Sequence, residues 1–382
     1  MKNKTICIFS SFYPPHVGGV ERFVHCLAHE LKKNINKIII VTINTNELDD
    51  IEIEDNLLIF RLPAYSLFKN RYPILKINKR FKTLIKQVLS HKPDLFIINL
   101  RFYLLSYFSA KLGNKNNIPV IAIEHITGHL TVHNPLLDLF GHYFEHFITK
   151  KTKKYVKNFY GVSNACNQWL KHFGIEASGI LYNSINIPTL HSLNFREELG
   201  ITKDGMIFLT ATRLLKEKGI LLLIEAFEQI NIKFPNTFLL VIGDGILYNN
   251  LQLKYQKRKN NVFMLGPESN EEVLDIIEVS DIVVIPSYYP EGLPTLVLEA
   301  GALGKPVIAT DVGGTREIII NDSYGQLIQP KSINELTKAM FRYIEDENYR
   351  LVTGSNLKQR IEENFTWSKR ATEIMKILNT LT

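Results

Sequence analysis

Short, almost continuously apolar runs recur along the 382-residue chain, and segments with helical spacing separate them. Apolar side chains at every position, rather than at alternate ones, indicate strands that are buried on both faces of a mostly parallel sheet. Apolar residues at i, i+3 and i+4 predict the intervening helices. In the first half, the predicted strands are 6–9, 37–43, 57–62, 94–100, 119–124 and 159–163, and helices are predicted at 20–33 and 80–90.

The second half repeats this alternation. Its predicted strands are 206–213, 238–243, 261–266, 282–286 and 306–310, with helices at 219–230, 332–345, 348–362 and 367–380. Two such blocks predict an α/β protein with two doubly wound, Rossmann-like domains, and a single core rarely grows past about 250–300 residues. We expect an N-terminal domain over 1–190, a C-terminal domain over 191–365, and a final helix over 366–382 that could pack back toward the first domain. Ligands of open parallel sheets bind beyond the carboxyl ends of the strands, so we expect the two domains to face a cleft that holds the site.

Composition and local sequence narrow the protein class. No apolar run approaches the ~20 residues of a membrane-spanning helix. Pro14 and Pro15 come before any long apolar segment can form, so we expect no signal peptide. The three cysteines, Cys7, Cys26 and Cys166, lack paired spacing and are predicted to be reduced core residues of a cytosolic protein.

The net charge of +7 is distributed unevenly, with +11 on residues 1–190 and −4 on the remainder. No acidic residue lies between Asp55 and Asp94, whereas nine Lys and Arg residues do. Within this region, segment 74–89 combines apolar and basic residues at near-helical spacing, as interfacial helices do. One hypothesis is that this segment binds an anionic membrane surface. The alternative is a helix whose apolar face packs on the sheet and whose lysines are only solvated.

Two loops after predicted strands have features that suit phosphate binding. Gly18 and Gly19 precede a helix, where backbone N–H groups can approach a phosphate closely, although the segment is neither GxGxxG nor GxxxxGK[ST]. In the corresponding loop of the second half, Arg213 and Lys218 lie between a strand and a helix. Arg offers a planar fork and Lys a point charge for a diphosphate, although solvated side chains are the usual fate of both residue types.

A third loop, in the segment PEGLPTLVLEA, carries two carboxylates eight residues apart, Glu291 and Glu299. Pro294 is suited to the first helical position, which leaves the N–H groups of Thr295 and Leu296 as an anion-binding point. Glu299 falls among apolar neighbours and needs a partner, which a ribose diol or a basic side chain would supply. Two carboxylates around a phosphate-binding helix start suit a sugar nucleotide.

Histidines recur at intervals of four in EHITGHLTVH, at His125, His129 and His133. This spacing raises the possibility of a metal site, but Gly128 and the strand-like start argue against one helix that carries all three. No HExxH motif or cysteine pair accompanies them, so we predict no metal site. The basic first half lacks the aromatic interleaving of a single-strand nucleic-acid platform, and we predict no nucleic-acid partner.

In order along the chain, these segments resemble retaining glycosyltransferase family four, which has the GT-B fold. The resemblance rests on YPPHVGGVE, EH at 124–125, GVSN at 161–164, LYNSIN at 181–186, TRLLKEKG, VIGDG at 241–245, ATDVGG, and the E-x7-E spacing of Glu291 and Glu299. Family members commonly have V-x-N-G-V-D in place of LYNSIN, so Ser184 and Asn186 depart from the pattern at the interdomain turn.

The resemblance implies roles for individual residues. The first domain would be the acceptor side and the second the donor side. His125 and Glu291 are implied as catalytic residues near the transferred sugar, and Glu299 would bind the ribose. The implied donor-binding residues are Gly18, Gly19, Arg213, Lys218, Gly243, Gly292, Leu293, Thr295, Leu296 and Glu299. No cofactor is implied beyond the nucleotide-diphosphate sugar as co-substrate.

The predicted function is therefore a retaining, metal-independent glycosyltransferase that moves a hexose-type sugar to an acceptor hydroxyl in cell-surface polysaccharide or glycolipid synthesis. The acceptor would be a sugar or a lipid-linked saccharide, and the enzyme is expected in the cytoplasm or on the inner face of the membrane. A sugar-nucleotide epimerase or a phosphorylase on the same fold is an alternative, as is a non-catalytic sugar-nucleotide-binding protein. An epimerase would need no acceptor, and a phosphorylase would need phosphate.

Overall fold

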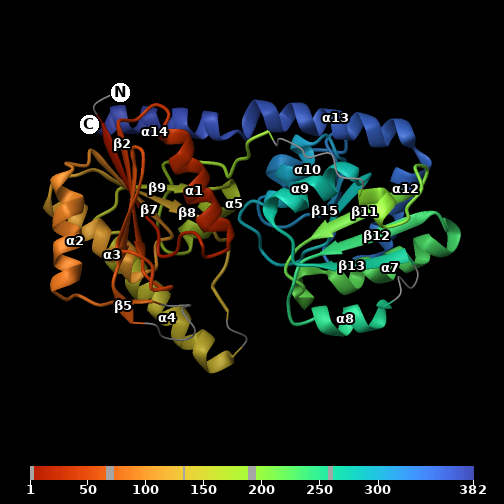
Figure 1. The fold of residues 1–382 in the computed structure, drawn as a ribbon, viewed down its shortest axis with the longest axis horizontal. Coiled ribbons are helices and arrows are strands. Elements are labelled where there is room, and N and C mark those ends of the chain that lie inside the picture. Colours follow the sequence, from red (N-terminus) through yellow and green to blue (C-terminus); the bar gives the residue numbers. More distant parts are fainter. Residues whose placement is uncertain (1–3, 66–72, 132–133, 188–194, 257–260) are drawn as a thin grey trace. The chain divides into compact units, whose positions relative to one another are not determined.

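The computed structural model describes the whole chain except residues 1–3, 66–72, 132–133, 188–194 and 257–260. The chain divides into two compact units, each with its own sheet (Figure 1). Unit 1 comprises Met1–Ser184 together with Trp367–Thr382, and unit 2 comprises Ile185–Thr366. Each unit is described separately below.

Unit 1 contains an eight-stranded sheet in the order β10-β9-β8-β7-β1-β2-β4-β3. Its strands are β1 (Thr5–Phe9), β2 (Lys37–Ile43), β3 (Ile51–Glu54), β4 (Leu57–Leu62), β7 (Leu95–Asn99), β8 (Val120–Glu124), β9 (Asn158–Gly161) and β10 (Gly179–Ile180). Every pairing is parallel except that of the edge strand β3 with β4. The central strands β1, β7 and β8 are buried along their whole length, as their continuous apolar sequences predict.

The helices of unit 1 are α1 (Gly19–Leu31), α2 (Lys79–Ser90), α3 (Leu104–Lys115), α4 (Pro135–Thr152), α5 (Asn164–Lys171) and α14 (Trp367–Leu381). A two-stranded ribbon, β5 (Ala64–Tyr65) with β6 (Ile74–Leu75), accompanies them. Side-chain caps fix three helix starts. Asn78 accepts a hydrogen bond from Phe81 N–H before α2, Asn134 accepts hydrogen bonds from Leu136 and Leu137 N–H before α4, and Ser163 accepts one from Cys166 N–H before α5. The last helix, α14, packs on α1, where the Trp367 ring lies 5.2 Å from that of Phe23.

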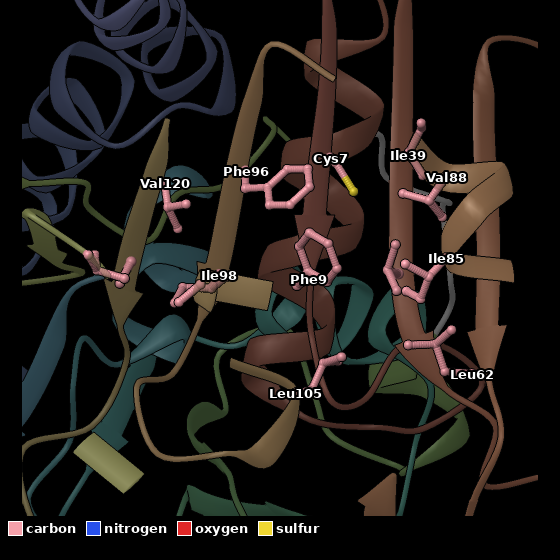
Figure 2. Close-up of a cluster of buried hydrophobic side chains, with 14 of the residues drawn as sticks. Cys7, Phe9, Ile39, Leu62, Ile85, Val88, Phe96, Ile98, Leu105 and Val120 are labelled. Carbon is pink, nitrogen blue, oxygen red and sulfur yellow. The ribbon is translucent and has the colours of Figure 1, made fainter. Parts of the chain in front are cut away.

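One side of this sheet forms a continuous core with α2 and α3. Figure 2 shows Phe9 and Phe96 on neighbouring strands and Ile85 and Val88 of α2 beside Leu62 and Ile39. The rings of Phe9 and Phe96 meet edge to face with centroids 4.8 Å apart. Strand and helix side chains therefore interdigitate in one layer, which holds the carboxyl ends of β1, β7 and β8 in fixed positions.

The apolar side chains of α2 correct the prediction of an interfacial helix in segment 74–89. Phe81, Leu84, Ile85 and Val88 are buried in the core of unit 1, so they are not available to a lipid surface. The basic residues of α2 lie on the opposite, exposed face. The alternative interpretation is the right one for this helix, because the sheet needs an apolar cover and α2 supplies it.

Unit 2 contains a six-stranded, wholly parallel sheet in the order β13-β12-β11-β14-β15-β16. Its strands are β11 (Met206–Ala211), β12 (Thr237–Ile242), β13 (Val262–Gly266), β14 (Ile282–Ile285), β15 (Val307–Thr310) and β16 (Gln326–Ile328). Its helices are α6 (Phe195–Glu198), η2 (Lys216–Lys218), α7 (Ile220–Lys233), α8 (Tyr248–Lys254), α9 (Asn270–Val279), α10 (Thr295–Ala302), α11 (Thr315–Ile318), α12 (Ile333–Glu345) and α13 (Glu347–Asn364).

The predicted fold class is confirmed, because both units are doubly wound sheets of mainly parallel strands. The three cysteines are free; Cys7 and Cys166 are buried, and Cys26 is partly buried. Among the described residues, no helix is both long enough and apolar enough to cross a membrane.

Candidate functional site

A pocket in unit 2 lies where the carboxyl ends of β11 and β14 meet the start of α10. It encloses about 120 Å³. Its lining consists of Thr210, Ala211, Thr212, Lys218, Ile285, Pro286, Ser287, Glu291, Pro294, Thr295 and Leu296. Four of the residues that the sequence singled out therefore share one pocket at the expected edge of the sheet, namely Lys218, Glu291, Thr295 and Leu296.

Lys218 and Glu291 form an ion pair across this pocket. The ammonium group also lies 5.2 Å from the centre of the Tyr289 ring, and Glu291 accepts a 3.1 Å hydrogen bond from Ser287 Oγ. The sequence assigned Lys218 to a diphosphate and Glu291 to a sugar but did not predict that they contact each other. A ligand that enters this pocket must therefore compete with, or share, an existing ion pair.

Arg213 is exposed in the loop after β11, and its charge acts on Tyr289. Burial, followed by the charge of Glu291, raises the pKa of Tyr289, while Arg213 acts in the opposite direction. The phenol is protonated at neutral pH, as an ordinary tyrosine is, and this shift moves its ionisation still further from that range. Tyr289 was missed in the sequence, although its position two residues before Glu291 places it in the same loop.

The start of α10 differs in one detail from the expectation. The helix begins at Thr295, and Pro294 is the extended residue before it (φ −70°, ψ 116°), rather than the first helical residue. No side chain of the described residues caps this start. The first N–H groups of α10 thus remain suited to an anion, while Gly292 and Leu293 belong to the preceding loop, where Leu293 is buried.

Glu299 is buried on α10, with only 5% of its surface exposed, among Val297, Leu298 and Ala300. It is not one of the described residues that line the pocket at Glu291. The two carboxylates of the E-x7-E segment therefore occupy different environments. Glu291 is partly exposed and ion-paired in a loop, and Glu299 is enclosed by the packing of α10.

Two glycines are required by close backbone contacts near the pocket. Gly313 has φ +54°, and a Cβ there would lie 1.7 Å from the carbonyl oxygen of Glu291, which also accepts a 3.2 Å hydrogen bond from Gly314 N–H. Gly243 has φ +125°, and a Cβ would lie 1.9 Å from Thr212 O. Without a side chain, Gly243 allows the end of β12 to pack closely on the loop that carries Arg213. In the same way, Gly313 allows its backbone to pack closely on that of Glu291.

In unit 1, the glycine pair occupies the start of α1. Gly18 is the extended N-cap, and Gly19 is the first helical residue with open space around it. The carboxylate of Glu21 folds back over the helix start, because a Cβ on Gly18 would lie 2.2 Å from Glu21 Oε2. The expected phosphate position at Gly18 is therefore next to a carboxylate, which complements the helix N-terminus electrostatically in the absence of an anion.

His125 follows β8 and is held by its neighbours. Its Nε2 lies 2.9 Å from Asn99 Oδ1, and the amide nitrogen of Asn99 donates to Phe9 O at 3.2 Å. The second bond makes Oδ1 the acceptor, so His125 carries its proton on Nε2 and presents an unprotonated Nδ1. Burial lowers the pKa of His125 from its ordinary value of 6.5 to about 3, which keeps the imidazole neutral.

A buried ionic network lies next to His125. Arg101, which is 1% exposed, forms ion pairs with both Glu124 and Glu145. Glu124 Oε1 in turn accepts hydrogen bonds from the backbone N–H groups of His125 (3.1 Å) and Ile126 (3.2 Å). Asn99 and Arg101 were missed in the sequence because nothing local marks them. Glu124 was noted only as half of the EH pair, yet it fixes the backbone that carries His125.

Comparisons with known proteins agree with this architecture. Residues 17–187 match the family described as Glycosyltransferase Family 4, and residues 192–360 match the family described as Glycosyl transferases group 1. The two matches are consecutive and correspond to the two halves of the chain. The chain belongs to the family 4 (group 1) glycosyltransferases, and it is an enzyme of the transferase class with the GT-B fold.

Three individual proteins illustrate the likeness. An uncharacterised glycosyltransferase of Methanocaldococcus jannaschii is 26% identical over 393 residues and is covered over the full length of both chains. A UDP-Gal:alpha-D-GlcNAc-diphosphoundecaprenol alpha-1,3-galactosyltransferase of Escherichia coli is 28% identical over 193 residues, 49% of each chain. Sucrose-phosphate synthase of Thermosynechococcus elongatus has a similar structure, with a TM-score of 0.79 at 21% identity over 99% of both chains.

Proposed function

We propose that this enzyme transfers a hexose from a nucleotide-diphosphate sugar to an acceptor hydroxyl with retention of configuration. The observation that carries the proposal is the pocket of unit 2, where Lys218, Glu291 and the uncapped start of α10 converge. A cation and free N–H groups suit a diphosphate, and a carboxylate beside them suits sugar hydroxyls. Sugar nucleotides join these two chemistries in one molecule.

In the proposed mechanism, the diphosphate binds to Lys218, Arg213 and the first N–H groups of α10. Binding draws Lys218 away from Glu291 toward the phosphates, so Glu291 becomes free to accept hydrogen bonds from the sugar. As the bond between the anomeric carbon and the phosphate oxygen breaks, these same donors stabilise the charge that develops on the leaving diphosphate. Glu299 holds the ribose, and no step depends on a metal ion.

We assign the proton transfer to the donor itself. The acceptor hydroxyl attacks the anomeric carbon from the face that the diphosphate leaves, and a phosphate oxygen takes the hydroxyl proton. His125 is neutral and fixed by Asn99, so its Nδ1 serves as a hydrogen-bond acceptor for a hydroxyl of the transferred sugar or the acceptor. In this scheme, His125 therefore contacts and orients a substrate hydroxyl.

We propose a sugar or a lipid-linked saccharide as the acceptor, with the enzyme attached peripherally to the cytoplasmic face of a membrane. The E. coli relative, whose name specifies a diphosphoundecaprenol acceptor, supports a role in cell-surface polysaccharide or glycolipid synthesis. Because the apolar face of α2 is buried, we assign the apolar part of the membrane contact to another helix.

The exposed face of α4 is the better candidate for that contact. Leu136, Phe140, Tyr143 and Phe147 recur at helical spacing and are 79%, 71%, 71% and 56% exposed. The same stripe continues into Lys150 and Lys151 at the last turn, with the Lys151 ammonium 5.3 Å from the Phe147 ring centre. An apolar stripe that ends in basic residues is complementary to an anionic lipid surface.

A donor screen tests the proposed reaction. The enzyme is incubated with UDP-, GDP- and ADP-hexoses and short saccharide acceptors, with and without EDTA, and NMR follows the anomeric configuration. We expect release of one nucleoside diphosphate, a retained anomer and undiminished turnover in EDTA. Epimerisation without an acceptor would favour the epimerase, a requirement for phosphate would favour the phosphorylase, and stabilisation without turnover would favour the binding protein.

Vesicle sedimentation tests the membrane contact separately. We expect the wild type to pellet with phosphatidylglycerol vesicles at low salt and not with phosphatidylcholine vesicles. The double variant Phe140→Ser, Tyr143→Ser should lose this binding, and Ile53→Ser, an exposed apolar position on the edge strand β3, is the matched control. Equal binding of the α4 variant and the control would contradict the assignment to α4.

A further inference from the structure

Three histidines in unit 1 come together from segments far apart in the sequence. His129 lies in the loop after β8, His146 on α4, and His172 directly after α5. Each offers one ring nitrogen, and the three nitrogens lie within 4.8 Å of one another. The His125, His129 and His133 spacing seen in the sequence is a different set. His125 is bonded to Asn99, and His133 lies outside the described residues.

The separation of the ring nitrogens is close to that of ligands on one small cation. His146 Nε2 and His172 Nε2 are 3.2 Å apart. Zinc–nitrogen bonds of about 2.0–2.1 Å in a tetrahedral site place ligand nitrogens about 3.3–3.4 Å from each other. The third nitrogen, on His129, lies within 4.8 Å of the other two, so the His129 ring must move toward them to complete the ligand set.

His129 also has the outer support that metal-binding histidines use. Its Nδ1 bonds Glu145 Oε2 at 2.7 Å, and Arg101 holds the other oxygen of Glu145. With Nδ1 bonded to a carboxylate, Nε2 of His129 is the nitrogen that would bind the metal. The His172 ring is likewise restrained, because it stacks on Trp169 with an interplanar angle of 3° and centroids 4.8 Å apart.

The cluster is accessible and has room for a further ligand. His146 and His172 are exposed and line a hollow of about 310 Å³ with Phe173, Lys150 and Lys153. Lys153 donates to the backbone carbonyl of Phe173, whereas Lys150 keeps a positive charge at the rim. Three imidazoles with an open fourth position are the ligand set of a zinc ion, and a nearby cation favours an anionic fourth ligand.

We propose that His129, His146 and His172 form a zinc-binding site in unit 1, built from residues other than those of the proposed sugar-nucleotide pocket of unit 2. The ion would connect the loop after β8 with α4 and α5. This site does not depend on the proposed sugar-transfer chemistry.

Metal titration of full-length, tag-free protein tests the site. The protein is dialysed against EDTA, and Zn²⁺ binding is measured by calorimetry and Co²⁺ binding by its visible spectrum. We expect one equivalent of Zn²⁺, a tetrahedral Co²⁺ spectrum and a higher melting temperature with Zn²⁺. His146→Ala and His172→Ala change exposed side chains, so both should fold, which far-UV circular dichroism checks, and both should lose at least tenfold in Zn²⁺ affinity.

Two further variants sharpen the test. His91→Ala removes a histidine of unit 1 that contacts Lys37 outside the cluster, and it should bind Zn²⁺ like the wild type. Glu145→Gln keeps the size of the side chain that orients His129 and should weaken Zn²⁺ binding about 10–100-fold. The proposal is overturned if the wild type binds no Zn²⁺ at micromolar concentration, or if His146→Ala and His172→Ala bind it as tightly as His91→Ala.

Discussion

The candidate regions of unit 1 and unit 2 differ in exposure and in how their charged groups are paired. In unit 2, Arg213 and Glu291 lie on loops, and Lys218 ends the short helix η2. Arg213 is exposed, whereas Lys218 and Glu291 are partly exposed and form an ion pair with each other. In unit 1, His125 is neutral and locked by Asn99, beside an ionic network that is almost fully buried. One region can exchange its partners when a charged ligand arrives, whereas the other is fixed in advance.

Under the proposed function, net charge does not identify the part of the molecule that binds the phosphates. Residues 1–190 carry the excess positive charge, yet the cation in the strongest candidate pocket belongs to the net-negative remainder. Local geometry at the carboxyl ends of β11 and β14 matters more, because a phosphate needs a few converging donors. The overall charge acts at longer range, for instance toward an anionic surface.

The largest effect is expected when the buried ionic network of unit 1 is disrupted. Arg101→Met leaves Glu124 and Glu145 without their buried counter-charge, and removing one partner of a buried pair costs about 3–5 kcal/mol. Urea unfolding should show this loss. Arg80→Met, which breaks an exposed pair with Asp50, is the matched control and should leave the midpoint unchanged. Equal midpoints for the two variants would show that the network does not stabilise unit 1.

The next prediction concerns the backbone that positions Glu291 in unit 2. Gly313→Ala forces a Cβ against the Glu291 carbonyl at a positive φ, so Glu291 must move and turnover should fall at least tenfold. Gly141→Ala adds a methyl group to open space on α4 and should stabilise slightly, by roughly 0.5–1 kcal/mol. Initial rates and thermal unfolding of both variants are the measurement. Full turnover in Gly313→Ala would show that the position of Glu291 is not critical.

A third prediction separates the two carboxylates. Glu299→Gln should weaken nucleoside-diphosphate binding, by an amount typical of a hydrogen bond to a charged group, about 1.5–3 kcal/mol. Glu291→Gln should lower turnover but leave that affinity intact, because it releases Lys218 from its ion pair. Calorimetry with the nucleoside diphosphate alone distinguishes them. A similar loss of affinity in both variants would contradict the division of roles.

The smallest effect concerns pH. The pKa of His125 is about 3 in the folded protein and near 6.5 when unfolded, so the neutral ring contributes stability that is fully present above pH 6.5. This contribution falls as the pH drops from 6.5 toward 3, with a slope of at most about 1.4 kcal/mol per pH unit. His125→Gln should remove that slope in urea unfolding at pH 7, 6 and 5. Parallel pH dependences would contradict the burial of a neutral His125.

Several features were readable from the sequence because they depend on local pattern. Continuous apolar runs marked the central strands, and the Glu291–Glu299 spacing placed one carboxylate before α10 and the other on it. The Lys218–Glu291 pair, the Arg101 network and the His129, His146, His172 cluster were not readable. Each joins residues of different elements, and only the packing of the sheet brings them together.

The helices α2 and α4 show the same limit for surfaces. Both carry apolar and basic residues, and α2 has the more regular pattern, yet its apolar side is the one that the core covers. The face of α4 that carries Phe140 and Tyr143 is exposed although it reads as a less regular pattern. Periodicity indicates that a face exists, and the tertiary structure decides what covers it.

The central claim is that unit 2 holds the donor through its cationic loop. Calorimetric titration of UDP, GDP and ADP into the wild type, Arg213→Ala, Lys218→Ala and His125→Ala tests it most directly. One nucleoside diphosphate should bind the wild type and His125→Ala alike, and its affinity for Arg213→Ala and Lys218→Ala should fall by about 10–100-fold. Undiminished affinity in both loop variants, with a loss in His125→Ala, would contradict the account.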